Sequence, residues 1–300
     1  MRFGMIGFGE VGGILSAALR DKGAEVAAFD LRIAEASVQA RARTAGVRTC
    51  ESSAALMADA EVVVSAVTAS STLAAAEEAA RTIRPGSFYL DLNSASPDTK
   101  ARCAKAVDAA GAKYVEAGVM TSVPPYGIKV PMVIGGRHAA DLQAKLAPYG
   151  FAMEVVSETI GVASAIKMCR SVIIKGMEAI VIESFTTARR HGVEARVLES
   201  LQETFPGLDW EKQGSYFFSR VVQHGKRRSE EMKEAAVTVR EAGFDPFLAA
   251  ATSEKQGQVA KLAAKGTFAG LAADAGWREH ADRLIGAQVP AEDHRRKKSA

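Results

Sequence analysis

The most constraining feature of the chain is a run of three glycines near its start, Gly7, Gly9 and Gly12. The run directly follows a short apolar segment, Phe3–Ile6, and opens a stretch of helical character. In that setting the first glycine permits a tight turn, the second lets a pyrophosphate approach the backbone, and the third lets helix and strand pack closely. Free N–H groups at the start of the helix then bind phosphate oxygens. We therefore predict a dinucleotide phosphate loop formed by Gly7, Phe8, Gly9, Glu10, Val11 and Gly12.

An acidic residue ends the next expected strand, Glu25–Phe29. Asp30 follows Gly12 by 18 residues, close to the offset of about 20 residues at which an acid binds the ribose hydroxyls of NAD. Arg32 lies two residues further on, and a guanidinium there suits the 2′-phosphate of NADP instead. We predict NAD as the cofactor, with NADP as the alternative.

Short apolar segments alternate with helical stretches over residues 1–160, which is the pattern of βαβ units in a parallel sheet. The segments are rich in β-branched and aromatic residues and mostly lack alternation, as expected of strands buried on both faces. One intervening helix is expected to begin with Ser96 as its cap and Pro97 in its first turn. The expected strands are Phe3–Ile6, Glu25–Phe29, Val62–Val67, Phe88–Leu92, Tyr114–Ala117, Pro131–Ile134 and Met153–Val156.

The strand pattern stops at about residue 161. The stretch Ala163–His191 contains no proline and has apolar residues around most of its circumference, which predicts a long, largely buried helix. Apolar residues recur at helical spacing further on as well. We predict an α/β protein with a Rossmann-like doubly wound sheet in residues 1–160 and an all-helical substrate and dimerisation domain in residues 161–300, ending in a frayed tail over residues 290–300.

Composition limits the class of partner. The net charge is +3, with 38 Lys and Arg against 35 Asp and Glu, so nothing indicates a nucleic-acid or membrane partner, and a small molecule is expected. The three cysteines form no CxxC pair, which favours reduced thiols in a cytoplasmic protein, and Cys169 is expected to be buried and inert. The five histidines show no HxxxH spacing, so we predict no metal site. The apolar run at the N-terminus is too short for a signal peptide.

Three further motifs follow the glycine loop: Asp91–Pro97, Tyr114–Ser122 and Gly161–Lys167. With that loop they make the chain resemble the β-hydroxyacid dehydrogenase family, which includes 6-phosphogluconate and 3-hydroxyisobutyrate dehydrogenases, over nearly its whole length. The resemblance implies that the first motif passes near the nicotinamide ribose. The residues assigned to the cofactor there are Asn93 and Ser94, together with Val67 and Thr68 at the end of the preceding strand.

The other two motifs carry the chemistry that the resemblance implies. Ser122 stands where the family's substrate loop has a serine, but Val123 and Pro124 replace the two glycines that follow it, which stiffens the loop. Lys167 matches the family's catalytic lysine. Ser171 stands where the family usually has asparagine, on the same helical face as Lys167, and its hydroxyl replaces only part of the hydrogen bonding of an amide.

Lys167 also qualifies as a general acid and base on its own residue context. Its sequence neighbours are Ala163, Ala165, Ile166, Met168 and Cys169, which offer an ammonium little polar surface to reach. Desolvation and a nearby cationic nicotinamide lower the pKa of a lysine, so that it can accept a hydroxyl proton. Ser122 and Ser171 are then expected to orient the substrate. The alternative is a lysine that merely extends from the helix to solvent.

The segment His224–Met232 resembles a branch of the family that has its own helical domain. His224, Arg227 and Arg228 are candidates for binding a substrate carboxylate or phosphate, because arginine binds such anions bidentately; a solvated helix face is the alternative. Trp210 and the aromatic run Tyr216–Phe218 are expected to be core rather than a pocket lining.

Together these patterns predict an NAD(P)-dependent oxidoreductase that acts on a small hydroxy acid or related alcohol, and the resemblance implies a homodimer built on the helical half. Two other interpretations stay open. One is a redox-neutral isomerase or lyase that uses NAD transiently, and the other is a dinucleotide-binding sensor without turnover.

Overall fold

The computed structural model describes residues 1–288, so the frayed tail expected over residues 290–300 lies outside the described residues. The chain forms two compact units. The first consists of Met1–Arg170 and Val237–Asp245, and the second of Ser171–Ala236 and the residues from Pro246 onward. The domain boundary expected at residue 160 stays a prediction.

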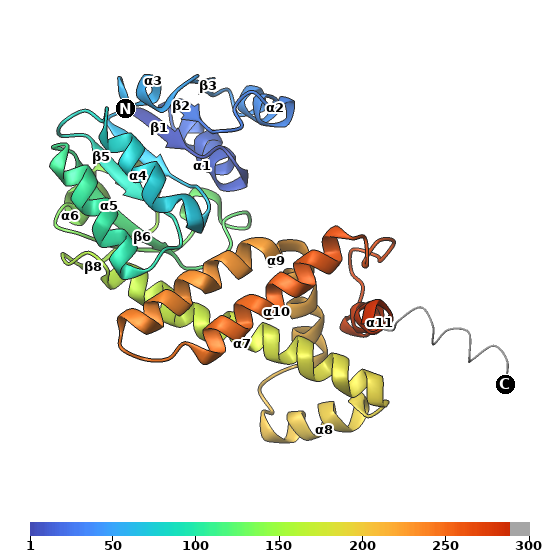
Figure 1. The fold of residues 1–300 in the computed structure, drawn as a ribbon. Helices are drawn as coiled ribbons and strands as arrows, with labels where there is room; N and C mark the ends of the chain where they lie inside the picture. Colours follow the sequence, from blue (N-terminus) through green and yellow to red (C-terminus); the bar gives the residue numbers. More distant parts are fainter. Residues whose placement is uncertain (289–300) are drawn as a thin grey trace. The chain divides into compact units, whose positions relative to one another are not determined.

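The first unit contains an eight-stranded sheet in the order β3-β2-β1-β4-β5-β6-β7-β8. Figure 1 shows several of these strands together with helices of the same unit. All neighbouring strands are parallel except β6 and β7. The glycine loop follows β1 at the point where the strand order reverses, which is where ligands bind in open α/β sheets. The strands are β1 (Arg2–Ile6), β2 (Glu25–Phe29), β3 (Arg48–Thr49), β4 (Val62–Ser65), β5 (Phe88–Asp91), β6 (Lys113–Val119), β7 (Met132–Gly135) and β8 (Met153–Ser157).

The seven expected strands are present, and the doubly wound prediction is confirmed with two differences. β3 is too short, at two residues, to give a recognisable sequence pattern. The sheet is also not wholly parallel, because β6 and β7 are joined by a connection whose only regular element is the 3₁₀ turn Gly127–Lys129. A parallel pair is usually joined by a crossover helix, and this connection contains none, which suits an antiparallel pair.

Helices cover both faces of the sheet, and each face has its own apolar core. One core receives side chains from α1 (Glu10–Asp21), α2 (Ala36–Thr44) and α6 (Ala139–Leu146). The other receives them from α3 (Ser53–Met57), α4 (Thr72–Ala80) and α5 (Pro97–Ala109). The start of α5 is as predicted, because the Ser96 hydroxyl accepts a hydrogen bond from the backbone N–H of Thr99 and Pro97 opens the helix.

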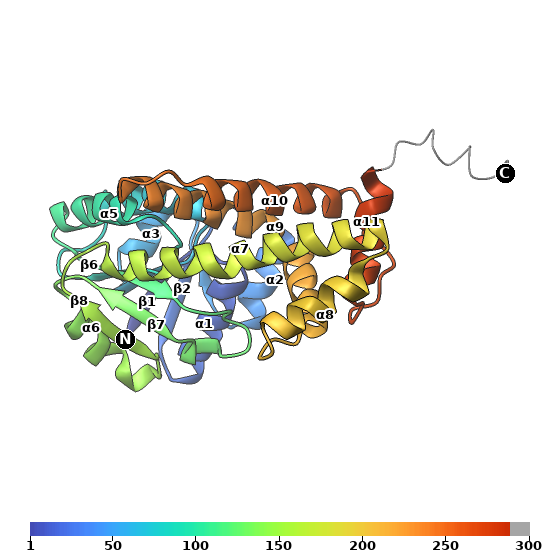
Figure 2. The ribbon, with the colours of Figure 1, turned by 90° about the horizontal axis from the view of Figure 1, so that it is seen from below.

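The second unit is helical. Its elements are α7 (Val162–His191), α8 (Glu194–Thr204), α9 (Trp210–Glu241), α10 (Phe247–Ala264) and α11 (Trp277–Gln288), of which α7 begins and α9 ends within the first unit. Within the second unit α7, α9 and α10 run side by side (Figure 2). Trp210, Phe217 and Phe218 lie in its apolar core, as expected, whereas Tyr216 is exposed. None of the helices in residues 1–288 is long and apolar enough to cross a membrane.

One prediction about the cysteines is wrong. Cys50 and Cys103 are buried, but Cys169 is exposed. Apolar residues surround Cys169 in the sequence, and on a helix that is apolar on most sides their spacing does not reveal which face is covered. Its neighbours on the exposed face of α7, Ile166 and Ile173, are themselves exposed.

Candidate active site

The glycine loop has the geometry that its sequence predicts. Gly7 has a φ of +84°, and a Cβ atom there would lie 2.5 Å from the carbonyl oxygen of Ala66. A Cβ on Gly12 would collide with the carbonyl oxygen of Gly7. At Gly9, by contrast, no heavy atom of the described residues apart from its two chain neighbours lies within 4 Å of the Cβ position. The first and third glycines are therefore required by the fold, whereas the second leaves open space for a ligand.

The start of α1 is open to an anion. Gly9 occupies the cap position, and among the described residues no side chain caps this helix. The first N–H groups of a helix need acceptors from outside it, and phosphate oxygens suit them and the positive end of the helix dipole. The loop therefore fits a dinucleotide pyrophosphate.

Asp30 links the end of β2 to the glycine loop. Its Oδ2 accepts a hydrogen bond of 2.7 Å from the backbone N–H of Phe8, and its Oδ1 accepts one of 2.8 Å from the N–H of Arg32. A carboxylate has about four acceptor positions, so Asp30 retains capacity for ribose hydroxyls. The Arg32 side chain is 63% exposed and lies 3.7 Å from Glu35. The structure thus places Asp30 beside the loop and Arg32 at its exposed margin.

Arg41 is a loop contact that the sequence did not reveal. Its Nη1 donates a hydrogen bond of 2.6 Å to the carbonyl oxygen of Phe8, and its aliphatic stem lies against Gly13 of α1. Arg41 comes from α2, 33 residues after Phe8, and no local spacing connects the two. It places a cation beside the expected pyrophosphate site.

The ends of β4 and β5 are joined by Asn93. Its Oδ1 accepts a 2.7 Å hydrogen bond from the N–H of Val67, and its Nδ2 donates one of 2.9 Å to the Ser65 hydroxyl. Asn93 and Ser94 are both buried, whereas Thr68 is exposed. The structure therefore brings Val67 and Asn93 together at the carboxyl edge of the sheet.

A buried ion pair fixes the end of β5. Lys100 Nζ lies 2.9 Å from Asp91 Oδ1, and both side chains are fully buried. Tyr114 donates a 2.7 Å hydrogen bond to Asp91 Oδ2, and the N–H of Asn93 donates one of 2.9 Å to Oδ1. Burial, reinforced by the Asp91 charge, holds the pKa of Tyr114 well above its usual value. Tyr114 therefore remains a hydrogen-bond donor that keeps Asp91, and the strand end bearing Asn93, in place.

Lys167 lies in the second turn of α7 and packs against β6 at Gly118. A Cβ on Gly118 would lie 2.9 Å from the carbonyl oxygen of Ala163 and 3.2 Å from the Cβ of Lys167. Only a glycine lets the helix come this close to the strand. The helix segment that carries Lys167 is therefore set directly on the strand that leads to Ser122.

Glu116 holds the same helix from the same strand. Its fully buried carboxylate accepts hydrogen bonds from three N–H groups at the start of α7, those of Gly161 (2.7 Å), Ala163 (3.1 Å) and Ser164 (3.3 Å). These groups have no acceptor within the helix, and a carboxylate there also complements the helix dipole. Glu116 thus caps α7 and fixes the start of the helix that carries Lys167.

Ser122 lies in the turn that follows β6 and is half-buried. The carbonyl of the next residue, Val123, accepts hydrogen bonds from the N–H groups of Tyr126 (3.0 Å) and Gly127 (2.7 Å). Val123 itself is buried. The residues that replace the family's two glycines therefore form an anchored turn, which agrees with the stiffer loop expected from the sequence.

The other predicted substrate residues belong to the helical unit. Arg228 is buried and forms a bidentate pair with Glu178, in which Nε donates to Oε2 at 2.8 Å and Nη2 donates to Oε1. Arg227 is half exposed, 3.9 Å from Glu231, and His224 is half-buried. Ser171 is buried beside Lys175. A substrate role for Arg228 stays a prediction, and its pairing with Glu178 favours a structural role.

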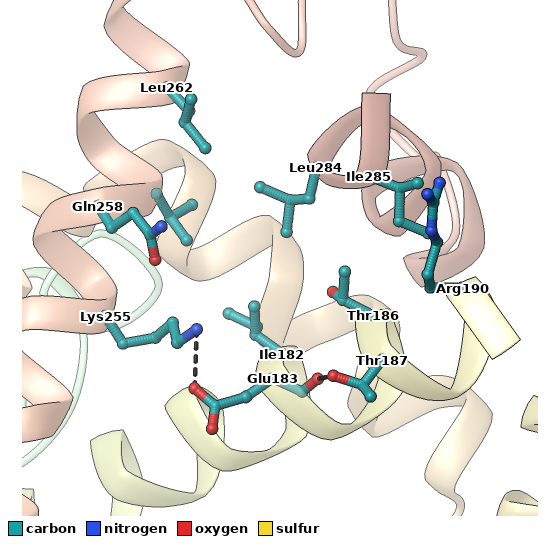
Figure 3. Close-up of a pocket in the computed structure, with 11 residues that line it drawn as sticks. Ile182, Glu183, Thr186, Thr187, Arg190, Lys255, Gln258, Leu262, Leu284 and Ile285 are labelled. Carbon is teal, nitrogen blue, oxygen red and sulfur yellow. Dashed lines mark hydrogen bonds and ion pairs between the residues drawn. The ribbon is translucent and has the colours of Figure 1, made fainter. Parts of the chain in front are cut away.

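The helical unit also has an open groove of 360 Å³ (Figure 3). α7, α10 and α11 line it with an apolar floor that includes Ile182 and Val259, and its rim carries the ion pair of Lys255 and Glu183 (2.8 Å). None of the predicted site residues lines the groove. Within residues 1–288 no three His, Cys, Asp or Glu side chains are grouped to hold a metal ion.

Two family models match the chain. Residues 2–140 match the NAD binding domain of 6-phosphogluconate dehydrogenase, and residues 188–259 match a domain of unknown function (DUF1932). An uncharacterized 28.5 kDa protein of Methanothermus fervidus, from the 7S RNA 5′ region, is 32% identical over 251 residues, which are 83% of this chain and 94% of the relative.

Several solved structures are similar to the chain. A conserved hypothetical protein from Sinorhizobium meliloti 1021 is 39% identical, with a TM-score of 0.74 over 95% of this chain and 96% of the other. The conserved protein MTH1747, described as structurally similar to 3-hydroxyacid dehydrogenases, is 35% identical, with a TM-score of 0.68 over 88% and 99%. The 3-hydroxyisobutyrate dehydrogenase of Mycobacterium tuberculosis, solved with L-serine, shares the fold at 18% identity, with a TM-score of 0.65 over 94% and 98%.

The chain belongs to the family of 6-phosphogluconate and 3-hydroxyacid dehydrogenases, in a branch whose NAD-binding domain is followed by this helical domain. Its cofactor is NAD(P), and the resemblance found in the sequence is confirmed. The open space at Gly9, the uncapped start of α1 and the spare acceptor capacity of Asp30 all fit such a cofactor.

Proposed function

We propose that the protein is a dehydrogenase or reductase that transfers a hydride between NAD(P) and a small hydroxy acid or related alcohol. The observation that carries the proposal is the placement of Lys167 by Glu116 and Gly118, in the same unit as the glycine loop. When a buried carboxylate of a neighbouring strand caps a helix, the backbone that carries the general acid and base is held in a fixed position. The relative solved with L-serine, itself a small hydroxy acid, supports this substrate class.

In the proposed reaction Lys167 accepts the proton of the substrate hydroxyl while the hydrogen on the same carbon leaves as hydride, so that the alcohol becomes a carbonyl. The bound cofactor supplies the hydride acceptor. In the reverse direction Lys167 returns the proton to the carbonyl oxygen. Ser122 and Ser171 orient the substrate oxygens by hydrogen bonding. Arg227 and His224 are candidates for binding an anionic group of the substrate.

The glycine loop and the strand ends would hold the cofactor. The loop residues bind the pyrophosphate, Asp30 binds the adenine ribose, and Asn93 and Ser94, with Val67 and Thr68, lie toward the nicotinamide ribose. We propose NAD as the preferred form, because a carboxylate at Asp30 accepts hydrogen bonds from ribose hydroxyls and repels a 2′-phosphate. Arg32, exposed two residues later, leaves NADP as a weaker ligand.

Titration with NADH and NADPH, followed by nicotinamide fluorescence, tests the cofactor site. The native protein is expected to bind NADH more tightly than NADPH. Gly12→Val is expected to abolish binding, because its side chain would collide with the carbonyl of Gly7. Gly286→Ala is the control, since its Cβ would meet no heavy atom within 4 Å other than those of its chain neighbours and its own helix backbone. Failure of the native protein to bind either cofactor below millimolar concentration would overturn the proposal. Tight binding without any absorbance change at 340 nm across a panel of hydroxy acids would instead favour a sensor.

We also propose a homodimer built on the helical unit. Ile173 and Ile180 of α7 are 64% and 61% exposed, and their spacing of seven residues puts them on one face of the helix. Ile174, next to Ile173, is 38% exposed as well, and exposed apolar residues gathered on one face favour a protein–protein contact. Sedimentation velocity should give twice the chain mass for the native protein. Ile173→Lys/Ile180→Lys should shift the protein to a monomer, and a monomeric native protein would refute the proposal.

A further inference from the structure

One face of α7 carries three buried polar side chains that no apolar core requires. Ser171, Lys175 and Glu178 are 7%, 6% and 1% exposed, and their spacing of four and three residues aligns them along the helix. α9 supplies a partner for each of the two charged groups, and α7 and α9 lie side by side at this point (Figure 2). The partners, Arg228 and Glu231, both come from the segment His224–Met232 that marks this branch of the family.

The two ion pairs differ in what they reach. Arg228 donates two hydrogen bonds from its guanidinium to the carboxylate of Glu178. Gln256 of α10 donates a further hydrogen bond of 3.1 Å to Glu178 Oε2. Lys175 Nζ lies 2.6 Å from Glu231 Oε2 and also donates a hydrogen bond of 3.4 Å to the hydroxyl oxygen of Ser171. The second pair therefore contacts Ser171, a residue with a proposed role in orienting the substrate.

A gain in the stability of the fold does not readily explain why a lysine is buried at position 175. Burial lowers the pKa of Lys175, which is the mark of an ammonium that has lost its hydration. Replacing a buried ion pair by apolar residues of similar volume is often neutral or stabilising. The short contact of Lys175 with Glu231 fixes the ammonium in place, which suits a role in positioning a neighbouring group.

The hydrogen bonding assigns that role. An ammonium has only donors, so the hydroxyl oxygen of Ser171 must be the acceptor in its contact with Lys175. The hydroxyl hydrogen of Ser171 is then directed away from Lys175. We propose that Glu231 and Lys175 form a positioning pair that fixes the Ser171 hydroxyl as a hydrogen-bond donor toward an oxygen of the substrate. This inference rests on the proposed function, in which Ser171 orients the substrate, and it gives the segment His224–Met232 an indirect role.

Replacement of the whole pair tests the proposal. Lys175→Met/Glu231→Leu removes both charges together, so that neither is left buried alone. With NAD and a turned-over hydroxy acid, this variant is expected to lose about tenfold in kcat, the scale of one lost hydrogen bond, while its NADH affinity stays unchanged. In a Ser171→Ala background the same double replacement should cause no further loss, because the pair acts through that hydroxyl.

Glu183→Leu/Lys255→Met is the control, since it removes another ion pair of α7 within the same unit (2.8 Å), whose residues have no proposed role in the reaction, and it should leave kcat within about twofold. If Lys175→Met/Glu231→Leu does not fold, Glu231→Gln, which keeps an acceptor for Lys175, should show a smaller loss of the same kind. Full activity of the pair variant beside an impaired Ser171→Ala protein, or an additive loss in the Ser171→Ala background, would overturn the positioning pair but leave the proposed function intact. Absence of hydride transfer by the native protein would instead overturn the proposed function.

Discussion

Lys167→Met is expected to bind NADH as the native protein does and to turn over a hydroxy acid about 10² to 10⁴ times more slowly, the range for loss of a positioned general acid and base. Methionine keeps the length and the apolar stem of the side chain but cannot exchange a proton. The packing of α7 on Gly118 involves the Cβ of Lys167, which the substitution retains. The loss should therefore fall on kcat, with the unfolding temperature nearly unchanged.

Steady-state kinetics and cofactor titration on the same preparation separate the two effects. Lys105→Met in α5 is the control, because Lys105 is exposed and belongs to the same unit. It should match the native protein in both measurements. Comparable turnover by Lys167→Met and the native protein would remove Lys167 from the mechanism and leave only the dinucleotide-binding part of the proposal.

The sequence predicted those parts of the fold that are governed by local physics. Gly7 and Gly12 are required by contacts within the strand–turn–helix unit itself, so their spacing is visible in the sequence. The start of α5 at Ser96 and Pro97 is equally local. The long helix α7 was predicted to within one residue, as Ala163–His191 against Val162–His191, because an apolar run without proline has few other structures open to it.

The sequence did not reveal contacts between segments that lie far apart along the chain. Glu116 binds N–H groups 45 or more residues later, and Arg41 binds a carbonyl 33 residues earlier. Glu116 lies within the motif Tyr114–Ser122, but the motif does not reveal which N–H groups its carboxylate binds, and Arg41 belongs to none of the motifs. Arg227 and Arg228 show that the sequence also fails to reveal which of two adjacent residues is exposed. They are neighbours in the sequence, but one residue turns an α-helix by about 100°, so Arg227 is exposed whereas Arg228 is buried against Glu178.

Glu116→Ala should strongly destabilise the first unit. The native carboxylate is fully buried and satisfies three N–H groups at the start of α7. A buried donor left without a partner costs about 1–3 kcal/mol. Because water can enter the space that the side chain leaves, we expect a total loss of about 3 kcal/mol in the free energy of unfolding. For a unit of this size that corresponds to a fall of about 6–12 °C in unfolding temperature.

Catalysis should fall as well, because the helix turn that carries Lys167 would lose its anchor. Thermal unfolding followed by circular dichroism, with kinetics measured below the transition, tests both expectations. Glu116→Gln keeps one acceptor oxygen but brings an NH₂ group toward a backbone N–H, so its losses should lie between those of the native protein and Glu116→Ala. Glu154→Ala in β8 removes an exposed carboxylate of the same unit and should change neither property. Native stability in Glu116→Ala would mean that α7 begins without its cap, and the position of Lys167 would then need another cause.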